Sequence, residues 1–257
     1  MYLTSILLPK ILHFGFVRKS QLATKFRYRK VVAMLQFMRK IMYEQQISEI
    51  MGKQSVAIVS GGIDSVTMLY EYANTIDLVL SFDYGASINK MEIPFALHHC
   101  LKLGINHKTI SLDFIKDNFH SRLLDKSDAT DVVPFRNGIM LSIACAFAEN
   151  IGLKYVLIAN NNGDQNNYPD CRTDFIKNMS DGFKCGTNNS VEIFAPYSMI
   201  SKSDILKRGI NYGVDYSRTY SCYDGGDIHC GKCNACQSRK IAFLQSNLID
   251  PTHYEKQ

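Results

Sequence analysis

Ser60-Gly61-Gly62-Ile63-Asp64-Ser65 follows the apolar run Ser55-Val56-Ala57-Ile58-Val59. A run rich in β-branched residues that breaks at two glycines before a helical pattern predicts a strand, a tight loop and a helix. Free N–H groups at such a helix start and the positive end of the helix dipole attract phosphate, and glycines let the anion approach. The stretch therefore predicts a phosphate-binding loop, although a turn that merely joins strand to helix would have the same local form.

Polar side chains in this loop suit a nucleotide. The hydroxyls of Ser60 and Ser65 can donate to phosphate, and Asp64 can hold the Mg²⁺ that accompanies ATP. No lysine follows the second glycine, so the loop differs from that of ordinary nucleoside triphosphatases. It resembles the Ser-Gly-Gly-x-Asp-Ser loop of the ATP pyrophosphatases, which cleave ATP between its α and β phosphates. We expect the nucleotide to contact Val59, Ser60, Gly61, Gly62, Ile63, Asp64, Ser65 and Val66.

Composition favours a folded protein without a membrane span. Hydrophobic residues make up 46% and charged residues 21% of the 257 residues, and no apolar stretch approaches the roughly 20 residues of a span. We therefore expect a soluble chain with one domain and additions, or two small domains.

The net charge of +5 is uneven: residues 1–50 carry +7, with Glu44 and Glu49 as their acidic residues, and the remainder carries −2. Such a basic leader could be a transit peptide, a basic amphipathic helix, or upstream sequence translated from a wrongly chosen start, which we favour. A nucleic-acid or membrane arm stays open, since a basic stretch alone is a weak signal.

Alternating strand and helix patterns follow the loop. This order predicts an α/β fold, a parallel sheet with helices on both faces, whose ligands bind at the carboxyl ends of the strands. The expected strands are 76–85, 107–112, 155–159 and 191–195, and the expected helices are 66–74, 92–103, 138–151, 172–183 and 202–208. We divide the chain into the leader 1–50, an α/β domain 51–215, and a C-terminal part 216–257.

Two loops at predicted strand ends carry polar residues beyond what packing needs. Arg136 stands just before a helix, where a fixed cation can meet phosphate or carboxylate. The stretch Tyr168-Pro169-Asp170-Cys171-Arg172 joins an aromatic ring, an acid, a thiol and a guanidinium, with Asp164 in the same loop. Taken alone, each loop is also compatible with a simple helix start.

Cysteine spacing near the C-terminus predicts a metal site. Cys222, Cys230, Cys233 and Cys236 lie within one short stretch, and four thiolates form the closed shell of a structural Zn²⁺. An iron–sulfur cluster is the main alternative. We expect His229 to be a solvent-exposed spare and the helix Asn234–Leu244 to begin at the last cysteines. Thiols kept reduced for a metal favour the cytoplasm.

From about Gln54 to Leu244 the chain resembles the 7-cyano-7-deazaguanine synthase family. The resemblance rests on the phosphate loop, Phe82-Asp83-Tyr84-Gly85, Pro134-Phe135-Arg136-Asn137, Tyr168-Pro169-Asp170-Cys171-Arg172, Ala195-Pro196, Ser201-Lys202 and the four cysteines. It implies an adenine nucleotide alpha hydrolase-like fold and a ligase that activates 7-carboxy-7-deazaguanine with ATP, adds ammonia, and dehydrates the amide to the nitrile with a second ATP.

The resemblance also implies roles for residues. Asp64 would hold magnesium on pyrophosphate and Arg136 would offset charge on the transferred group, so both are expected to be catalytic. The deazaguanine pocket would be lined by Asp164, Tyr168, Asp170 and Arg172.

Two departures from the family pattern bear on substrate. Ala86-Ser87-Ile88 replaces Gln-Arg-His, and Asn166-Asn167 replaces Ser-Gly. We expect Lys90 to supply the missing positive charge. A divergent ligase acting on another acid or acceptor stays open. A zinc protein that binds nucleic acid is disfavoured, because the cysteine stretch holds only Lys232 and Tyr223 for such contacts. A homodimer is also left open.

Overall fold

The computed structural model describes Met34, residues 54–125 and residues 130–255. Apart from Met34, the predicted leader 1–50 lies outside the described residues. Residues Gly52–Gln257 form one compact unit. Within the described residues, no helix is long and apolar enough to cross a membrane.

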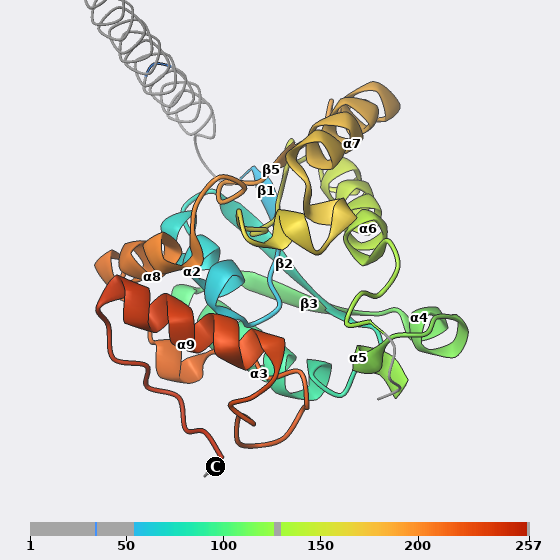
Figure 1. Ribbon diagram of the computed structural model, residues 1–257. Helices are drawn as coiled ribbons and strands as arrows, with labels where there is room; N and C mark the ends of the chain where they lie inside the picture. Colours follow the sequence, from blue (N-terminus) through green and yellow to red (C-terminus); the bar gives the residue numbers. More distant parts are fainter. Residues whose placement is uncertain (1–33, 35–53, 126–129, 256–257) are drawn as a thin grey trace, which may run out of the picture. The chain divides into compact units, whose positions relative to one another are not determined.

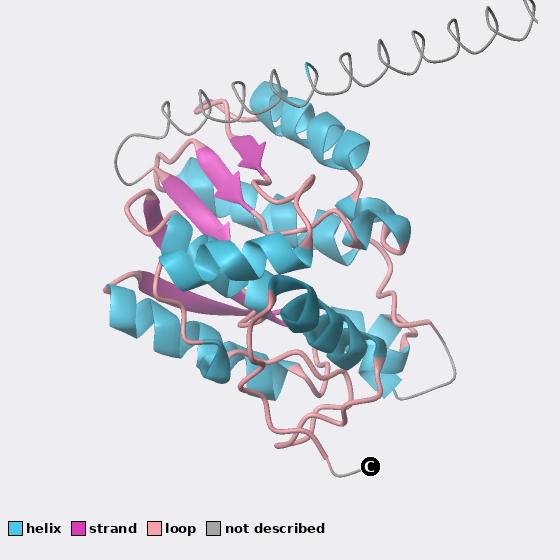
Figure 2. Ribbon diagram, turned by 60° about the vertical axis from the view of Figure 1, so that its left-hand side comes forward, coloured by secondary structure: helices cyan, strands magenta, loops and turns pink. Residues whose placement is uncertain are grey.

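A five-stranded parallel sheet forms the centre of this unit, in the order β3-β2-β1-β4-β5. Figure 2 shows the strands side by side with helices packed around them. Buried residues such as Val56, Leu80 and Val156 fill the central strands, as expected for a parallel sheet covered on both faces. The strands are β1 Ser55–Ile58, β2 Ile76–Asp83, β3 Asn106–Ser111, β4 Tyr155–Leu157 and β5 Glu192–Phe194.

Helices flank the sheet on both sides, which confirms the predicted α/β class (Figure 1). The helix α6 packs on β1 and β4, α3 packs on β2 and β3, and α2, α8 and α9 pack in sequence on one another. Predicted boundaries agree to within a few residues. The helices are α2 Ile63–Glu71, α3 Asn89–Leu103, α4 Asp113–Asn118, α5 Arg122–Asp125, α6 Arg136–Asn150, α7 Thr173–Gly186, α8 Lys202–Asn211 and α9 Asn234–Ser246.

The order of the strands places a switch point between β1 and β4. The chain moves outward from β1 through β2 to β3, then returns to the other side of β1 and continues to β5. Loops that leave β1 and β4 therefore diverge to opposite faces and open a crevice at their carboxyl ends. The phosphate loop follows β1, so the topology positions it at this crevice.

Candidate active site

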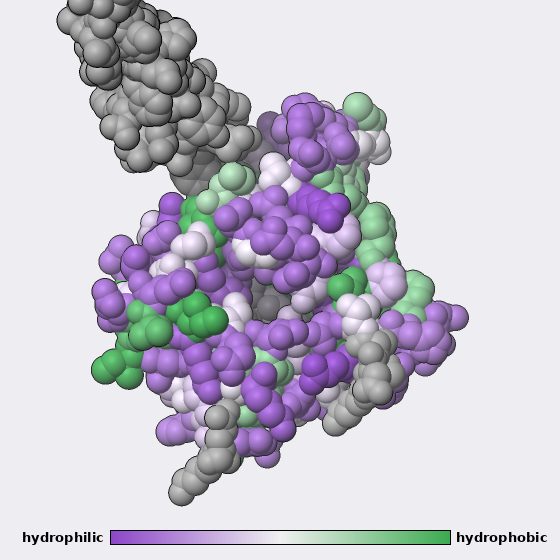
Figure 3. Space-filling model, in the orientation of Figure 1, coloured by the Kyte–Doolittle hydropathy of each residue, from purple (hydrophilic) through white to green (hydrophobic). Residues whose placement is uncertain are grey.

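A cavity of about 260 Å³ lies at the carboxyl ends of β1, β2 and β4. Figure 3 shows a hollow near the centre of one face of the molecule, with mainly hydrophilic residues around it. The cavity brings together the loop after β1, the start of α3, the start of α6, the loop after β4 and the start of α8. Segments far apart in the sequence thus share one site.

The phosphate loop is held in shape by its own hydroxyls. The Oγ of Ser65 accepts from the backbone N–H of Ser60 at 3.2 Å and of Gly61 at 3.3 Å, and lies 3.1 Å from the Oγ of Ser60. Of the expected nucleotide contacts, Gly61 and Val66 do not line the cavity, whereas these do: Val59, Ser60, Gly62, Ile63, Asp64 and Ser65.

Gly61 is needed for a reason other than anion approach. Its φ is +104°, which side chains rarely adopt, and a Cβ there would overlap the backbone carbonyl of Glu92 in α3. On its other side, the carbonyl of Gly61 accepts from the N–H of Tyr220 at 3.1 Å. The loop is therefore tied both to α3 and to the segment that leads into the cysteines.

Asp64 stands in a charged cluster. Its Oδ2 lies 3.2 Å from the Nζ of Lys202 and accepts from the Nδ2 of Asn161 at 3.1 Å, while Asp164 accepts from the N–H of Asn161 at 2.9 Å. Burial and the neighbouring Asp64 raise the pKa of Asp164. Burial opposes the charge on Lys202, but Asp64 and Asp164 raise its pKa above the ordinary value, so it stays cationic.

The Asp64 cluster fits a divalent cation. The Oδ1 of Asp64 is buried and has no hydrogen-bond partner among the described residues, which is costly unless something else occupies it. Carboxylate oxygens are the ligands that Mg²⁺ prefers, and Asp164 lies beside Asp64. The sequence assigned Asp164 to the base pocket, whereas the structure places it beside Asp64 and Lys202.

Arg136 lies in a second cluster, rich in tyrosines. Its Nη1 donates to the hydroxyl of Tyr84 at 2.7 Å and its guanidinium lies 5.0 Å from the centroid of that ring. The hydroxyls of Tyr168 and Tyr223 lie 3.2 Å apart and line the same cavity. Burial opposes the charge on Arg136, but Tyr84, Tyr223 and Glu92 raise its pKa, so the guanidinium is a fixed cation.

Of the remaining residues predicted to line the base pocket, some line the cavity and one does not. Asp170 is buried, lines the cavity, and caps α6 by accepting from the N–H of Asn137 at 2.8 Å. Cys171 also lines the cavity, and burial raises the pKa of its thiol to about 12, which leaves it protonated. Arg172, by contrast, is exposed and outside the cavity lining. It directly follows the short turn Pro169–Cys171, and its Nε donates to the carbonyl of Gln165 at 3.5 Å.

Several cavity residues were not singled out from sequence. Lys90, expected to supply a cation, is exposed and does not line the cavity, so this expectation is wrong in position. Lys202 lies beside Asp64 instead. Ile88, from the stretch Ala86-Ser87-Ile88 that differs from the family pattern, is an apolar residue in the cavity lining. The sequence feature that pointed to Lys202 was the Ser201-Lys202 pair at the predicted start of a helix. The other additions are Tyr84, Glu92, Asn160 and Tyr223.

The four cysteines form a buried cluster, called here the knuckle (residues 222–236). One ligand atom from each lies within 4.8 Å of the others, a spacing that a tetrahedral metal can bridge. Backbone N–H groups point at the sulfurs: Cys230 donates to Cys222 at 3.3 Å and Tyr223 donates to Cys233 at 3.4 Å. Donors of this kind stabilise thiolates, so the residues present fit a structural metal. Cys233 caps α9, as predicted.

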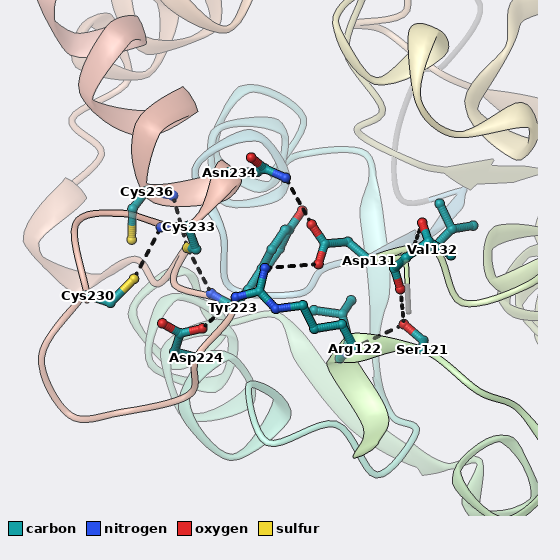
Figure 4. Close-up of polar contacts among 12 residues, drawn as sticks. Ser121, Arg122, Asp131, Val132, Tyr223, Asp224, Cys230, Cys233, Asn234 and Cys236 are labelled. Carbon is teal, nitrogen blue, oxygen red and sulfur yellow. Dashed lines mark hydrogen bonds and ion pairs between the residues drawn. The ribbon is translucent and has the colours of Figure 1, made fainter. Parts of the chain in front are cut away.

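The knuckle is also joined to the segment between α5 and α6 (Figure 4). Arg122 of α5 lies 3.3 Å from Asp224 and 3.7 Å from Asp131, and Asn234 donates to Asp131 at 3.0 Å. Tyr220, Ser221 and Tyr223, which surround Cys222, line the cavity. One wall of the site is therefore built on the knuckle.

The predicted exposure of His229 is wrong. The residue is buried, its ring lies 4.6 Å from that of Tyr220 and 5.9 Å from that of Tyr254, and its Nε2 accepts from the N–H of Ser221 at 3.1 Å. The C-terminal residues cover it through a β-bridge to Tyr254. Local sequence gave no sign of this distant cover.

Comparison with known proteins agrees with this site. The chain is 47% identical over 215 residues to a 7-cyano-7-deazaguanine synthase of Porphyromonas gingivalis, covering 79% of this chain and 98% of that one. It is 37% identical to the enzyme of that name from Desulfotalea psychrophila (78% and 98% covered) and 41% identical to 7-cyano-7-deazaguanine synthase 1 of Colwellia psychrerythraea (80% and 100% covered).

A solved NMN synthetase from Francisella tularensis is a more distant match. It is 16% identical with a TM-score of 0.48, covering 81% of this chain and 86% of that one, and this likeness is too remote to bear on function. The family model for the queuosine biosynthesis protein QueC, in contrast, matches residues 54–247. The match takes in the phosphate loop, Arg136, Lys202 and all four cysteines, and the chain belongs to the QueC family.

Proposed function

We propose that this protein is an ATP-dependent ligase that converts 7-carboxy-7-deazaguanine and ammonia to 7-cyano-7-deazaguanine. The observation that carries the proposal is that one cavity holds both the Ser60–Ser65 loop and the Arg136 cluster, in a member of the QueC family. A nucleotide and a flat base can therefore meet in one cavity.

The residues suit adenylation. A carboxylate becomes an electrophile once its oxygen attacks the α phosphate of ATP and pyrophosphate leaves, and the protein contributes mainly by positioning and charge neutralisation. Lys202 and the phosphate loop would hold the phosphates, with Asp64 and Asp164 holding Mg²⁺. That ion would offset negative charge on pyrophosphate.

Two further stages complete the reaction in the same cavity. Ammonia attacks the acyl adenylate and AMP leaves, which gives the amide. The amide oxygen then attacks the α phosphate of a second ATP and pyrophosphate leaves, after which elimination of AMP with loss of the amide protons gives the nitrile. Cys171 takes no covalent part, because its thiol stays protonated.

The knuckle would hold one structural Zn²⁺ through Cys222, Cys230, Cys233 and Cys236. Four sulfur ligands leave no open position, so its role is to fix the cavity wall that carries Tyr223.

Thiols that must stay reduced to bind metal favour the cytoplasm. We retain the division into the leader 1–50, the catalytic part 51–215 and the knuckle part 216–257, and leave a homodimer open.

Incubation of the purified protein with ATP, ammonia and 7-carboxy-7-deazaguanine, followed by mass analysis, tests the proposal. We expect the nitrile, with two pyrophosphates released for each molecule formed, because two adenylations are required. Asp64→Ala serves as the inactive control. Pyrophosphate release without nitrile would replace the proposal with a divergent ligase, a reading motivated by the Ala86-Ser87-Ile88 departure.

A further inference from the structure

Glu92 is a cavity carboxylate that the adenylation chemistry does not use. It lies in the first turn of α3, is partly buried, and lines the cavity. Among the described residues its carboxylate has no hydrogen-bond or ion-pair partner within bonding distance. A carboxyl group that lines a cavity without a partner in the protein is available to a ligand that donates to it.

The groups that face Glu92 define what that ligand meets. Glu92 shares the cavity lining with Tyr84 after β2, Arg136 at the start of α6 and Tyr220 before the knuckle. The charge of Arg136 also acts on the carboxyl group of Glu92. Tyr84 is the hydrogen-bond partner of Arg136 among the described residues, so other N–H groups of its guanidinium remain for a ligand. A fixed donor and a carboxyl group without a protein partner therefore line the same cavity, together with aromatic rings.

We propose that Glu92 recognises the 2-amino-pyrimidinone edge of the base, accepting from its ring N–H and its amino group, while Arg136 donates to the neighbouring carbonyl oxygen. This inference rests on the proposed function and names a specificity-determining residue for it. A guanine-like edge reads acceptor, donor, donor, which complements a guanidinium beside a carboxylate, and the tyrosine rings suit a flat base.

The protonation of Glu92 gives a second signature. Burial raises the pKa of Glu92 to about 8, and the nearby Arg136 only partly offsets this. The empty site is therefore mostly protonated at pH 7, whereas two donors from the base require the carboxylate. Binding should release about one proton at pH 7, and affinity should rise with pH through about pH 8 and level off above it.

Calorimetry on the full chain tests the assignment with 7-carboxy-7-deazaguanine and with the analogue that lacks the 2-amino group. The parent should bind the analogue between about 5-fold and 150-fold more weakly, the range for a lost bidentate contact. Glu92→Gln, nearly the same shape, should weaken the parent ligand similarly, stop discriminating between the two ligands, and release no proton. Asp117→Asn, which removes an exposed carboxylate in α4, should match the parent.

The outcomes separate this inference from the proposed function. If the parent protein neither binds 7-carboxy-7-deazaguanine nor makes the nitrile, both the proposed function and this inference are wrong. If the parent binds and turns over the base but Glu92→Gln keeps its affinity and discrimination, the inference alone fails. A Glu92→Gln protein that keeps affinity but loses rate would also overturn it and assign Glu92 to proton transfer from ammonium. Melting temperature and ATP affinity check that the variant is folded.

Discussion

Lys202 supplies a positive charge to the part of the cavity that contains the phosphate loop and Asp64. It lies 3.2 Å from Asp64, and burial in a polar cavity makes its ammonium worth more than in water. We expect Lys202→Ala to slow pyrophosphate release about 100-fold, equivalent to ~2.7 kcal/mol in the barrier. Lys207→Ala, on the same helix but exposed and paired with Asp204, is the matched control. A Lys202→Ala enzyme with the parent rate would remove Lys202 from the mechanism.

Asp64 should be indispensable for turnover but not for folding. Its carboxylate contacts Lys202 and Asn161 at the cavity and has one buried oxygen available for a cation. We expect Asp64→Ala to release no measurable pyrophosphate, because magnesium would lose its ligand. Circular dichroism should show an intact fold. Release at the parent rate would contradict the assignment of the loop.

At the residue scale, sequence could predict those side chains whose role follows from local spacing. Asp64, Arg136 and the four cysteines stand in short patterns with a direct physical meaning, and all of them reach the site or cluster expected for them. Ser201-Lys202 belongs to the family resemblance, but the place of Lys202 beside Asp64 could not be predicted, and Glu92 could not be singled out. Both roles depend on neighbours brought close by the fold. The prediction for Lys90 was wrong, because a position close by in the sequence does not determine whether a side chain on a helix points into the cavity.

The knuckle is the element whose loss should affect both stability and binding. We expect about one Zn²⁺ per chain, and removal of the metal should lower Tm by ~10 °C or more, since structural zinc contributes on the order of 10 kcal/mol. Affinity for the base should also fall, because Tyr220, Ser221 and Tyr223 line the cavity.

Cys236→Ser tests this, with the exposed Cys185→Ser as control. Metal analysis, thermal melting and base binding are the three measurements. Iron with a visible charge-transfer band would overturn the zinc assignment, and unchanged binding by a metal-free folded protein would remove the knuckle from the cavity wall.

Sequence predicted the elements well and their mutual contacts poorly. The apolar periodicity of α7 and α8 and the β-branched runs of β1 and β2 are local properties, so strands and helices could be placed within a few residues. The cover over His229 comes from Tyr254, on a segment without a recognisable pattern. Burial produced by distant loops has no local signature.

On the scale of the whole molecule, residues 1–50 should be dispensable. Among residues 54–125 and 130–255, the buried core clusters run from Val56 to Phe243, and Gly52–Gln257 is a compact unit by itself. A chain that begins at Met51 should therefore fold with the parent Tm and bind ATP with the parent affinity, as measured by melting and calorimetry. Aggregation of the shortened chain would show that the leader contributes to folding.

The hydrogen bond from Tyr220 to the carbonyl of Gly61 has a consequence for the order of synthesis. Gly61 leaves the ribosome early, whereas Tyr220 and the knuckle beside it emerge near the end. A nascent chain thus carries the phosphate loop for most of its translation without the strap that fixes its backbone or the wall that closes its cavity. The cavity lining is therefore complete only once the residues around the knuckle have been made.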